Sequence, residues 1–136
     1  MAAAGVACLE QIADGKALAE ANRRGAQLRD GMNEVIDRHG LPMATYDVST
    51  YLVCLNHGGV AASARGFDAL TVDPARLKGA RPELVHGFRQ AMLLNGVDSM
   101  RESGFLSSAH TSLDVEHTIE AFDRSLTALT ADRLLG

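Results

Sequence analysis

Residues 104–111 of this chain read Gly-Phe-Leu-Ser-Ser-Ala-His-Thr, and a long amphipathic stretch follows them at 112–134. Apolar residues recur there at steps of three and four, which predicts a helix with one buried face; they are Val115, Ile119, Phe122, Leu126 and Leu129. Thr111 lies where an N-cap is expected, and Asp114 follows in the capping-box position. The pattern therefore predicts a short strand, a corner at His110 and Thr111, and a capped helix.

The predicted corner carries side chains that could contact a substrate. The hydroxyls of Ser107, Ser108 and Thr111 would lie near a helix N-terminus, which favours anions, so they are candidates for binding a substrate carboxylate. The ring of His110 could face a cleft or hydrogen-bond to the backbone. Ordinary capping and local turn formation are the simpler interpretation of the same residues. We therefore expect a cleft wall here and assign no catalytic residue.

The segments before this ending predict helices and a small sheet. The helix at 17–38 is expected to bury Leu18, Leu28 and Met32 along one face. A further short helix is expected to begin at Asp73-Pro74 inside an otherwise irregular stretch. The complete set is helices at 1–13, 17–38, 82–95 and 112–134, strands at 43–56 and 97–109, and a long loop at 57–81. This order predicts an α+β fold in which helices cover a small, largely antiparallel sheet.

Composition limits the function further. The 136 residues suit a single domain, and 46% are apolar, which argues against disorder. The net charge of -4, with acidic and basic residues intermixed, predicts no nucleic-acid partner. No apolar run approaches the roughly 20 residues of a membrane-spanning helix, so we expect no membrane partner. Cys8 and Cys54 are isolated cysteines, which fits a cytoplasmic protein.

Candidate catalytic groups are sparse. Lys16 follows a helix break and Lys78 lies in the irregular stretch, so both are expected to be solvated surface lysines. The histidines His86, His110 and His117 are not spaced as metal ligands usually are, and we predict no metal site.

Four segments together resemble the C-terminal end of class III aminotransferases that use pyridoxal 5'-phosphate (PLP), most closely the glutamate-1-semialdehyde 2,1-aminomutases. The opening Met-Ala-Ala-Ala-Gly-Val-Ala at 1–7 is similar to the start of the family's interdomain helix. Residues 26–32 resemble its Leu-Arg-x-Gly-Leu helix, and 88–97 resemble the helix ending in a Gly-Val turn. The ending at 104–111 with its following helix is the most specific match.

The resemblance implies the small C-terminal domain of a fold type I PLP enzyme, preceded by a long interdomain helix. It implies amino-group transfer through PLP in a homodimeric full enzyme acting on an amino acid or a semialdehyde. The family's aldimine lysine and phosphate-binding residues would precede Met1, in a large PLP domain, so we expect this chain alone to bind no PLP and to be inactive. By the same resemblance Ser49 and Thr50 join Ser107 to Thr111 as candidates for the cleft wall.

Other interpretations remain open. A transaminase with another amino donor fits as well as an aminomutase, because the strand start at 48–51 and the connection at 98–103 differ from the aminomutase pattern. A non-catalytic α+β module that self-associates through the helix at 1–13 is the main alternative. A small ligand-binding regulatory domain is a third possibility, which a tight pocket beside the 57–81 loop would support.

Overall fold

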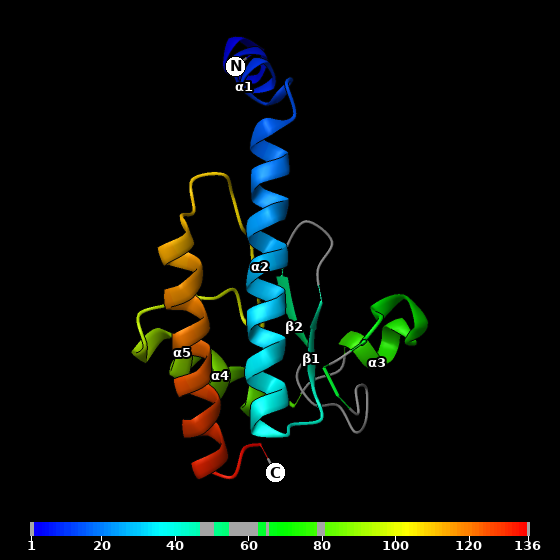
Figure 1. Ribbon diagram of the computed structural model, residues 1–136, viewed down its shortest axis with the longest axis vertical. Coiled ribbons are helices and arrows are strands. Elements are labelled where there is room, and N and C mark those ends of the chain that lie inside the picture. The colour runs from blue at the N-terminus through cyan, green and yellow to red at the C-terminus, as the bar shows by residue number, and fades with distance from the viewer. Residues whose placement is uncertain (1, 47–50, 55–62, 65, 79–80, 136) are drawn as a thin grey trace.

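The computed structural model describes residues 2–46, 51–54, 63, 64, 66–78 and 81–135, with the backbone alone for 51–54 and 78. Figure 1 shows a long central helix with a second helix alongside it, further helices behind and to one side, and a small sheet. In chain order the elements are α1 (Ala2–Ile12), α2 (Lys16–His39), β1 (Ala44–Tyr46), β2 (Tyr51–Cys54), a 3-10 turn η1 (Ala69–Thr71), α3 (Pro74–Lys78), α4 (Pro82–Leu94), β3 (Ser103–Gly104) and α5 (Ser112–Ala131).

Helix α2 organises the structure. Its apolar side buries Leu28, Met32, Val35 and Ile36, and Gly40 ends it in the left-handed conformation with φ of 64°, a common way to close a helix. The prediction that Leu18 is also buried is wrong, because its side chain is 59% exposed. Leu18 lies in the first turn of α2, beyond the reach of the elements that cover the rest of the face.

Helices α4 and α5 complete the core against α2. The rings of Phe88 in α4 and Phe122 in α5 meet edge to face, with centroids 6.0 Å apart and an interplanar angle of 74°. At Gly31 of α2, an added Cβ would lie 2.3 Å from Cδ1 of Ile119, so a glycine lets α2 and α5 approach closely here. The period of the sequence correctly predicted that Val115, Phe122, Leu126 and Leu129 of α5 are buried, whereas Ile119 is only partly buried.

The predicted helix at 112–134 ends early, at Ala131. Arg133 then has a φ of 57°, and the backbone N–H groups of Leu134 and Leu135 both donate to the carbonyl of Leu129. This turn folds the chain back so that Leu135, only 5% exposed, joins the core. Leu134 and Leu135 therefore belong to a turn that leads back to the core and not to a longer helix.

The sheet has three antiparallel strands in the order β1-β2-β3. Ala44 of β1 is paired with Cys54 of β2, and Tyr51 of β2 with Gly104 of β3. The predicted strands at 97–109 are mostly wrong: the structure has one bridge, between Met100 and Ser103, and the two-residue β3.

The prediction of a loop over 57–81 is correct only in part. η1 and α3 lie within that range, and Asp73 caps α3 by accepting from the N–H of Ala75 at 2.9 Å, as the Asp-Pro pair predicted. Asp68 caps η1 in the same manner through the N–H of Leu70. Capping by the aspartate side chains therefore gives short helical turns to a stretch whose sequence has no helical periodicity.

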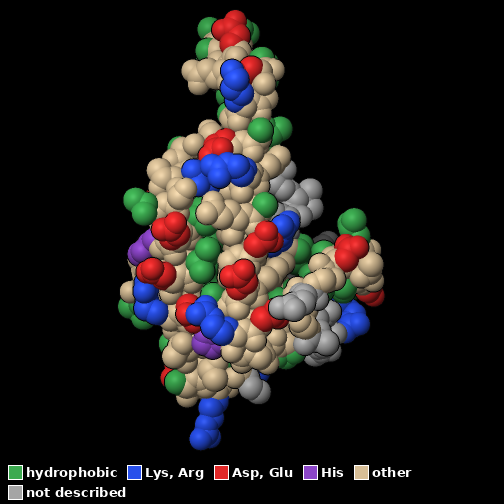
Figure 2. Space-filling view, viewed as in Figure 1, with side chains coloured by type: hydrophobic (Ala, Val, Ile, Leu, Met, Phe, Trp, Pro, Cys, Tyr) green, Lys and Arg blue, Asp and Glu red, His purple; other side chains and the backbone are tan. Residues whose placement is uncertain are grey.

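Helix α1 stands apart from the other elements and is exposed along its whole length (Figure 1). Figure 2 shows that the face over α2 and α5 carries interspersed acidic and basic side chains and no broad patch of one sign. Over the described part of the chain, no helix combines the length and the apolar character needed to cross a membrane.

Candidate functional site

The segment between β3 and α5 forms a turn held by its own side chains. Nδ1 of His110 accepts from the backbone N–H of Ser107 at 3.0 Å, and the Ser107 hydroxyl lies at the same distance from that nitrogen. The backbone N–H of Ala109 donates in turn to the Ser107 hydroxyl at 3.3 Å. These bonds explain why the predicted strand does not continue through 105–109: the backbone donors that a sheet would need are already used locally.

Thr111 and Asp114 form a capping box at the start of α5. The carboxylate of Asp114 accepts from both the backbone N–H of Thr111, at 2.6 Å, and its hydroxyl, at 2.8 Å. The Thr111 oxygen accepts from the N–H of Asp114 at 3.3 Å. A negative charge thus already lies at this helix N-terminus, which weakens its attraction for an anionic substrate.

Ser108 is the most available hydroxyl of the corner. It is exposed and, within the described residues, it has no hydrogen-bond partner. The structure therefore brings Ser107, His110 and Thr111 together as a rigid local turn and leaves Ser108 at its surface. Ser49 and Thr50 lie outside the described residues.

The capping box makes α5 sensitive to acid. Hydrogen bonds from the backbone and then the hydroxyl of Thr111 lower the pKa of Asp114 from its ordinary value of 3.8. A folded-state pKa below the unfolded one contributes stability that is fully present above the unfolded pKa and is lost as pH falls through the folded one. We expect the Asp114→Asn variant to be less stable than the wild type near neutral pH, with a difference that shrinks below about pH 4. Urea unfolding of the wild type and the variant, near neutral pH and below about pH 4, measures this difference in stability. An equal difference under both conditions would contradict the prediction.

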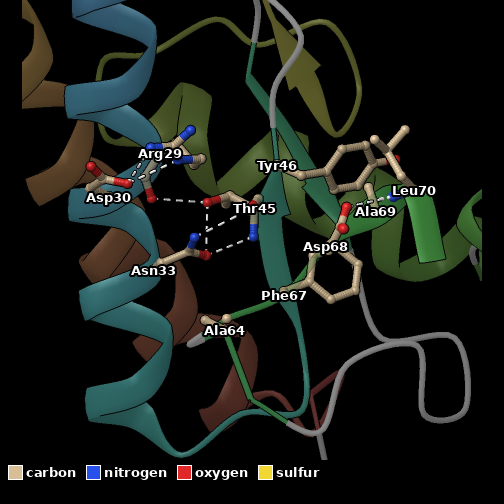
Figure 3. A pocket seen from close by; sticks show the side chains of 11 residues that line it. Arg29, Asp30, Asn33, Thr45, Tyr46, Ala64, Phe67, Asp68, Ala69 and Leu70 are labelled. Carbon is tan, nitrogen blue, oxygen red and sulfur yellow. Dashed lines mark hydrogen bonds and ion pairs between the residues drawn. The ribbon is translucent and has the colours of Figure 1, made fainter. Parts of the chain in front are cut away.

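A second candidate site is a pocket of about 370 Å³ between α2, β1 and residues 64 and 66–70 (Figure 3). The rings of Tyr46 and Phe67 lie against each other on one side, with centroids 5.8 Å apart. On the other side Arg29 of α2 is paired with Asp30, their nearest atoms 2.7 Å apart. The pocket thus combines an aromatic wall with a polar wall.

A set of polar contacts in this pocket joins α2 to β1. The side-chain oxygen of Asn33 accepts from the backbone N–H and the hydroxyl of Thr45, each at 2.8 Å, while its side-chain nitrogen donates to the Thr45 carbonyl at 3.1 Å (Figure 3). The Thr45 hydroxyl also lies 3.0 Å from the carbonyl oxygen of Arg29. Asn33 therefore satisfies the outer edge of β1 as a neighbouring strand would.

The sequence interpretation missed this pocket, although it named a pocket beside the 57–81 loop as the mark of a ligand-binding domain. A polar Asn33 next to the buried Met32 was an available signal, because a half-buried amide needs partners. The polar groups that line the pocket interact mainly with one another, so their presence is explained by the fold without a ligand. We assign no ligand to this pocket.

PLP is held in enzymes through a Schiff base with a lysine whose amine is shielded from water. Lys16 does not fit: its side chain is 87% exposed and its nitrogen lies 2.8 Å from Asp14. The side chain of Lys78 is outside the described part. Within the described ranges, no group of three or more histidine, cysteine or acidic side chains gathers as metal ligands would.

Comparison with curated proteins gives a consistent relationship. The chain is 30% identical over 130 residues to the glutamate-1-semialdehyde 2,1-aminomutase of Akkermansia muciniphila, a match that covers 93% of this chain and 28% of that protein. It is 32% identical over 113 residues to glutamate-1-semialdehyde 2,1-aminomutase 1 of Staphylococcus carnosus, covering 80% and 24%. The chain therefore spans about a quarter of the length of these relatives. No family model matches it.

Solved structures agree with the sequence matches. An omega-transaminase from Sphaerobacter thermophilus superposes with a TM-score of 0.62 at 18% identity, over 81% of this chain and 24% of that one. The FumI protein of Sphingopyxis sp. MTA144, solved as its PLP internal aldimine form, gives a TM-score of 0.59 at 25% identity, over 88% and 25%. By sequence this chain corresponds to the C-terminal part of glutamate-1-semialdehyde 2,1-aminomutases, and its fold is similar to about a quarter of the omega-transaminase and of the FumI protein.

Proposed function

We propose that this chain is the C-terminal domain of a PLP-dependent enzyme that transfers amino groups, either a glutamate-1-semialdehyde aminomutase or a transaminase, and that it is inactive alone. One observation carries the proposal: the match covers 93% of this chain but only 28% of the Akkermansia muciniphila aminomutase. The exposure of Lys16 supports it, since a solvated amine lacks the shielding that an amine bound to the cofactor needs.

The proposal includes the family's wider organisation. The domain would be the small domain of a fold type I enzyme, with 1–13 as the interdomain helix, and its partners would be the large PLP domain and a second subunit. The substrate would be an amino acid or a semialdehyde. A cytoplasmic location agrees with the exposed free thiol of Cys8, because reducing compartments keep such thiols unpaired.

Within this enzyme we assign the corner at 107–111 to the wall of the substrate cleft. Its hydrogen bonds support this role, since His110 and Asp114 accept from the backbone on both sides of the turn. Ser108 is the residue that would offer a hydroxyl, because the hydroxyls of Ser107 and Thr111 already serve the turn and the cap. Ser49 and Thr50 belong to the same proposal by family resemblance.

A chimeric enzyme tests the proposal. The N-terminal part of the Akkermansia muciniphila aminomutase would be joined to this chain in place of that protein's own matching part. We expect the chimera to retain PLP and to rearrange glutamate-1-semialdehyde at least about a hundredfold faster than either part alone, because loss of a positioning wall costs on that order. Amino transfer to a keto acid instead would select the transaminase branch.

The controls give each outcome a meaning. As a control, the two parts of the Akkermansia muciniphila aminomutase itself are joined with the same junction sequence. Activity of this protein shows that joining at this point preserves function. A folded chimera that transfers no amino group would contradict the proposal, and so would turnover by this chain alone with a borohydride-fixable PLP adduct. In an active chimera, Ser108→Ala should raise KM severalfold and change kcat less, whereas an unchanged KM would remove Ser108 from the cleft.

A further inference from the structure

The ring of His110 closes the turn at 107–110 as a hydrogen-bond acceptor. The backbone N–H of Ser107 donates to its Nδ1 at 3.0 Å, and a backbone amide nitrogen has no acceptor role to exchange for this one. Nδ1 must therefore carry a lone pair, so the neutral ring holds its proton on Nε2. Nε2 has no hydrogen-bond partner within the described part of the chain. The turn thus selects one tautomer of the uncharged imidazole.

A second proton on this ring removes the acceptor. Both nitrogens of an imidazolium are donors, so two N–H groups would face each other across the 3.0 Å between Nδ1 of His110 and the backbone nitrogen of Ser107. The Ser107 hydroxyl, also 3.0 Å from Nδ1, can accept from the charged ring. The backbone N–H of Ser107 nevertheless loses its partner, and protonation therefore weakens the turn.

His39, at the C-terminal end of α2, has the opposite role. Its Nε2 lies 2.6 Å from Oδ1 of Asp123 in α5, so the ring donates to a carboxylate. An Nε2–H group is present in one neutral tautomer and also in the imidazolium, so this bond survives protonation. Mild acid is therefore expected to act on the turn at 107–110 and to leave the contact of α2 with α5 at His39 in place.

We infer that the turn at 107–110 is a pH-sensitive switch, which neutral His110 holds closed and which opens when the ring binds a proton. His110 is then a positioning residue, because it fixes the backbone that carries Ser108. The opening of the turn follows from the geometry of this chain alone. Its consequence for a substrate rests on the proposed function, in which Ser108 belongs to the cleft wall and binds the substrate less tightly once the turn is open.

Two titratable groups of α5 lie near this ring. Asp114 interacts electrostatically with both His110 and His117, and hydrogen bonds from the backbone and then the hydroxyl of Thr111 hold its pKa below the ordinary 3.8. Asp114 therefore stays ionised at the pH where histidines ordinarily titrate, about 6.5. His117 can titrate in that range, but it makes no hydrogen bond within the described residues. It is therefore the natural control for His110.

The charged groups that α2 brings to this end of α5 keep their charge in the same range. Arg24 donates to the hydroxyl of Ser112 and is paired with Glu20, their nearest atoms 3.0 Å apart. The hydrogen bond from Arg23 to Glu20 is the main reason why the pKa of this carboxyl lies below its ordinary 4.5. A change in the turn near pH 6 is thus not expected to come from this ion pair.

NMR spectroscopy of the whole chain tests the switch. Hydrogen exchange of the Ser107 amide, relative to an unstructured peptide at the same pH, should become about fivefold faster as the His110 ring titrates. His110→Asn places an uncharged acceptor at the position of Nδ1, so its Ser107 amide should stay protected from about pH 8 to about pH 5. His110→Ala should leave the amide unprotected throughout, and His117→Gln should behave as the wild type does.

The results distinguish the switch from the proposed function. Protection of Ser107 that persists after His110 has titrated would overturn the inference, and so would loss of the pH effect in His117→Gln or a neutral ring with its proton on Nδ1. None of these measurements needs activity, so an inactive chimera contradicts the proposed function alone. In an active chimera, KM should rise severalfold more between about pH 8 and about pH 5 than in its His110→Asn variant. Equal pH profiles would show that the turn does not position the substrate.

Discussion

Replacing Phe122 with alanine should lower the free energy of unfolding by about 3–5 kcal/mol, the range for removing a large aromatic side chain from a packed core. Phe122 is fully buried in α5 and its ring packs on Phe88 of α4. The loss combines the transfer of apolar surface with an unfilled cavity between the two helices. Because a domain of this size is stabilised by only about 5–15 kcal/mol, the variant loses a large fraction of its stability.

Urea unfolding followed by circular dichroism measures this change. Leu113→Ala is the matched control, since Leu113 lies in the same helix with 74% of its side chain exposed, and it should change stability by at most about 0.5 kcal/mol. If Phe122→Ala does not fold, Phe122→Leu gives a measurable loss of about 1–2 kcal/mol. Equal stabilities of the Phe122 and Leu113 variants would show that α4 and α5 do not share a packed core.

Asn33→Ala should lower the free energy of unfolding by about 2–4 kcal/mol, because it removes the partner of three polar groups of Thr45. Thr45 is only 2% exposed, so its N–H and carbonyl cannot simply turn to bulk water. The variant also uncovers the outer edge of β1, where another strand can pair. We therefore expect increased aggregation as well as a lower urea midpoint.

The adjacent Glu34 supplies the control for this variant. It is exposed on α2, and Glu34→Ala should change stability by at most about 0.5 kcal/mol. Asn33→Asp keeps the two accepting interactions and loses the donation to the Thr45 carbonyl, so its stability should fall between those of the wild type and Asn33→Ala. Equal effects of the Asn33 and Glu34 alanine variants would contradict a structural role for the amide.

Helices and caps were predictable because their determinants are close in sequence. The capping box needs only Thr111 and Asp114, and the buried face of α5 follows from residues three and four apart. The resemblance of 104–111 to the aminotransferase ending was also carried by local sequence, and the chain does match the C-terminal part of glutamate-1-semialdehyde 2,1-aminomutases, as that resemblance indicated.

One wrong prediction concerned a segment in which local hydrogen bonding competed with a sheet. A strand was expected to include Phe105 to Ala109, but the hydrogen bonds among Ser107, Ala109 and His110 close a turn instead. A second wrong prediction concerned Leu18. It has helical spacing with the core residues, yet it lies beyond them along α2 and is exposed. Periodicity gives the direction of a side chain around a helix and says nothing about how far along the helix a neighbour extends.

The sequence by itself therefore determined the helices, the cap of α5 and the resemblance to the aminomutases, because helical periods, caps and short sequence motifs each depend on residues within a few positions of one another. Only the tertiary structure decided that Asn33 closes the edge of β1, that Tyr46 faces Phe67, and that α1 has no cover within the described chain. These depend on contacts between segments separated by 12 or more residues or on the lack of such contacts. Their energies become available only after the chain has folded on itself, so local sequence can show that a side chain needs a partner but not which residue that partner is.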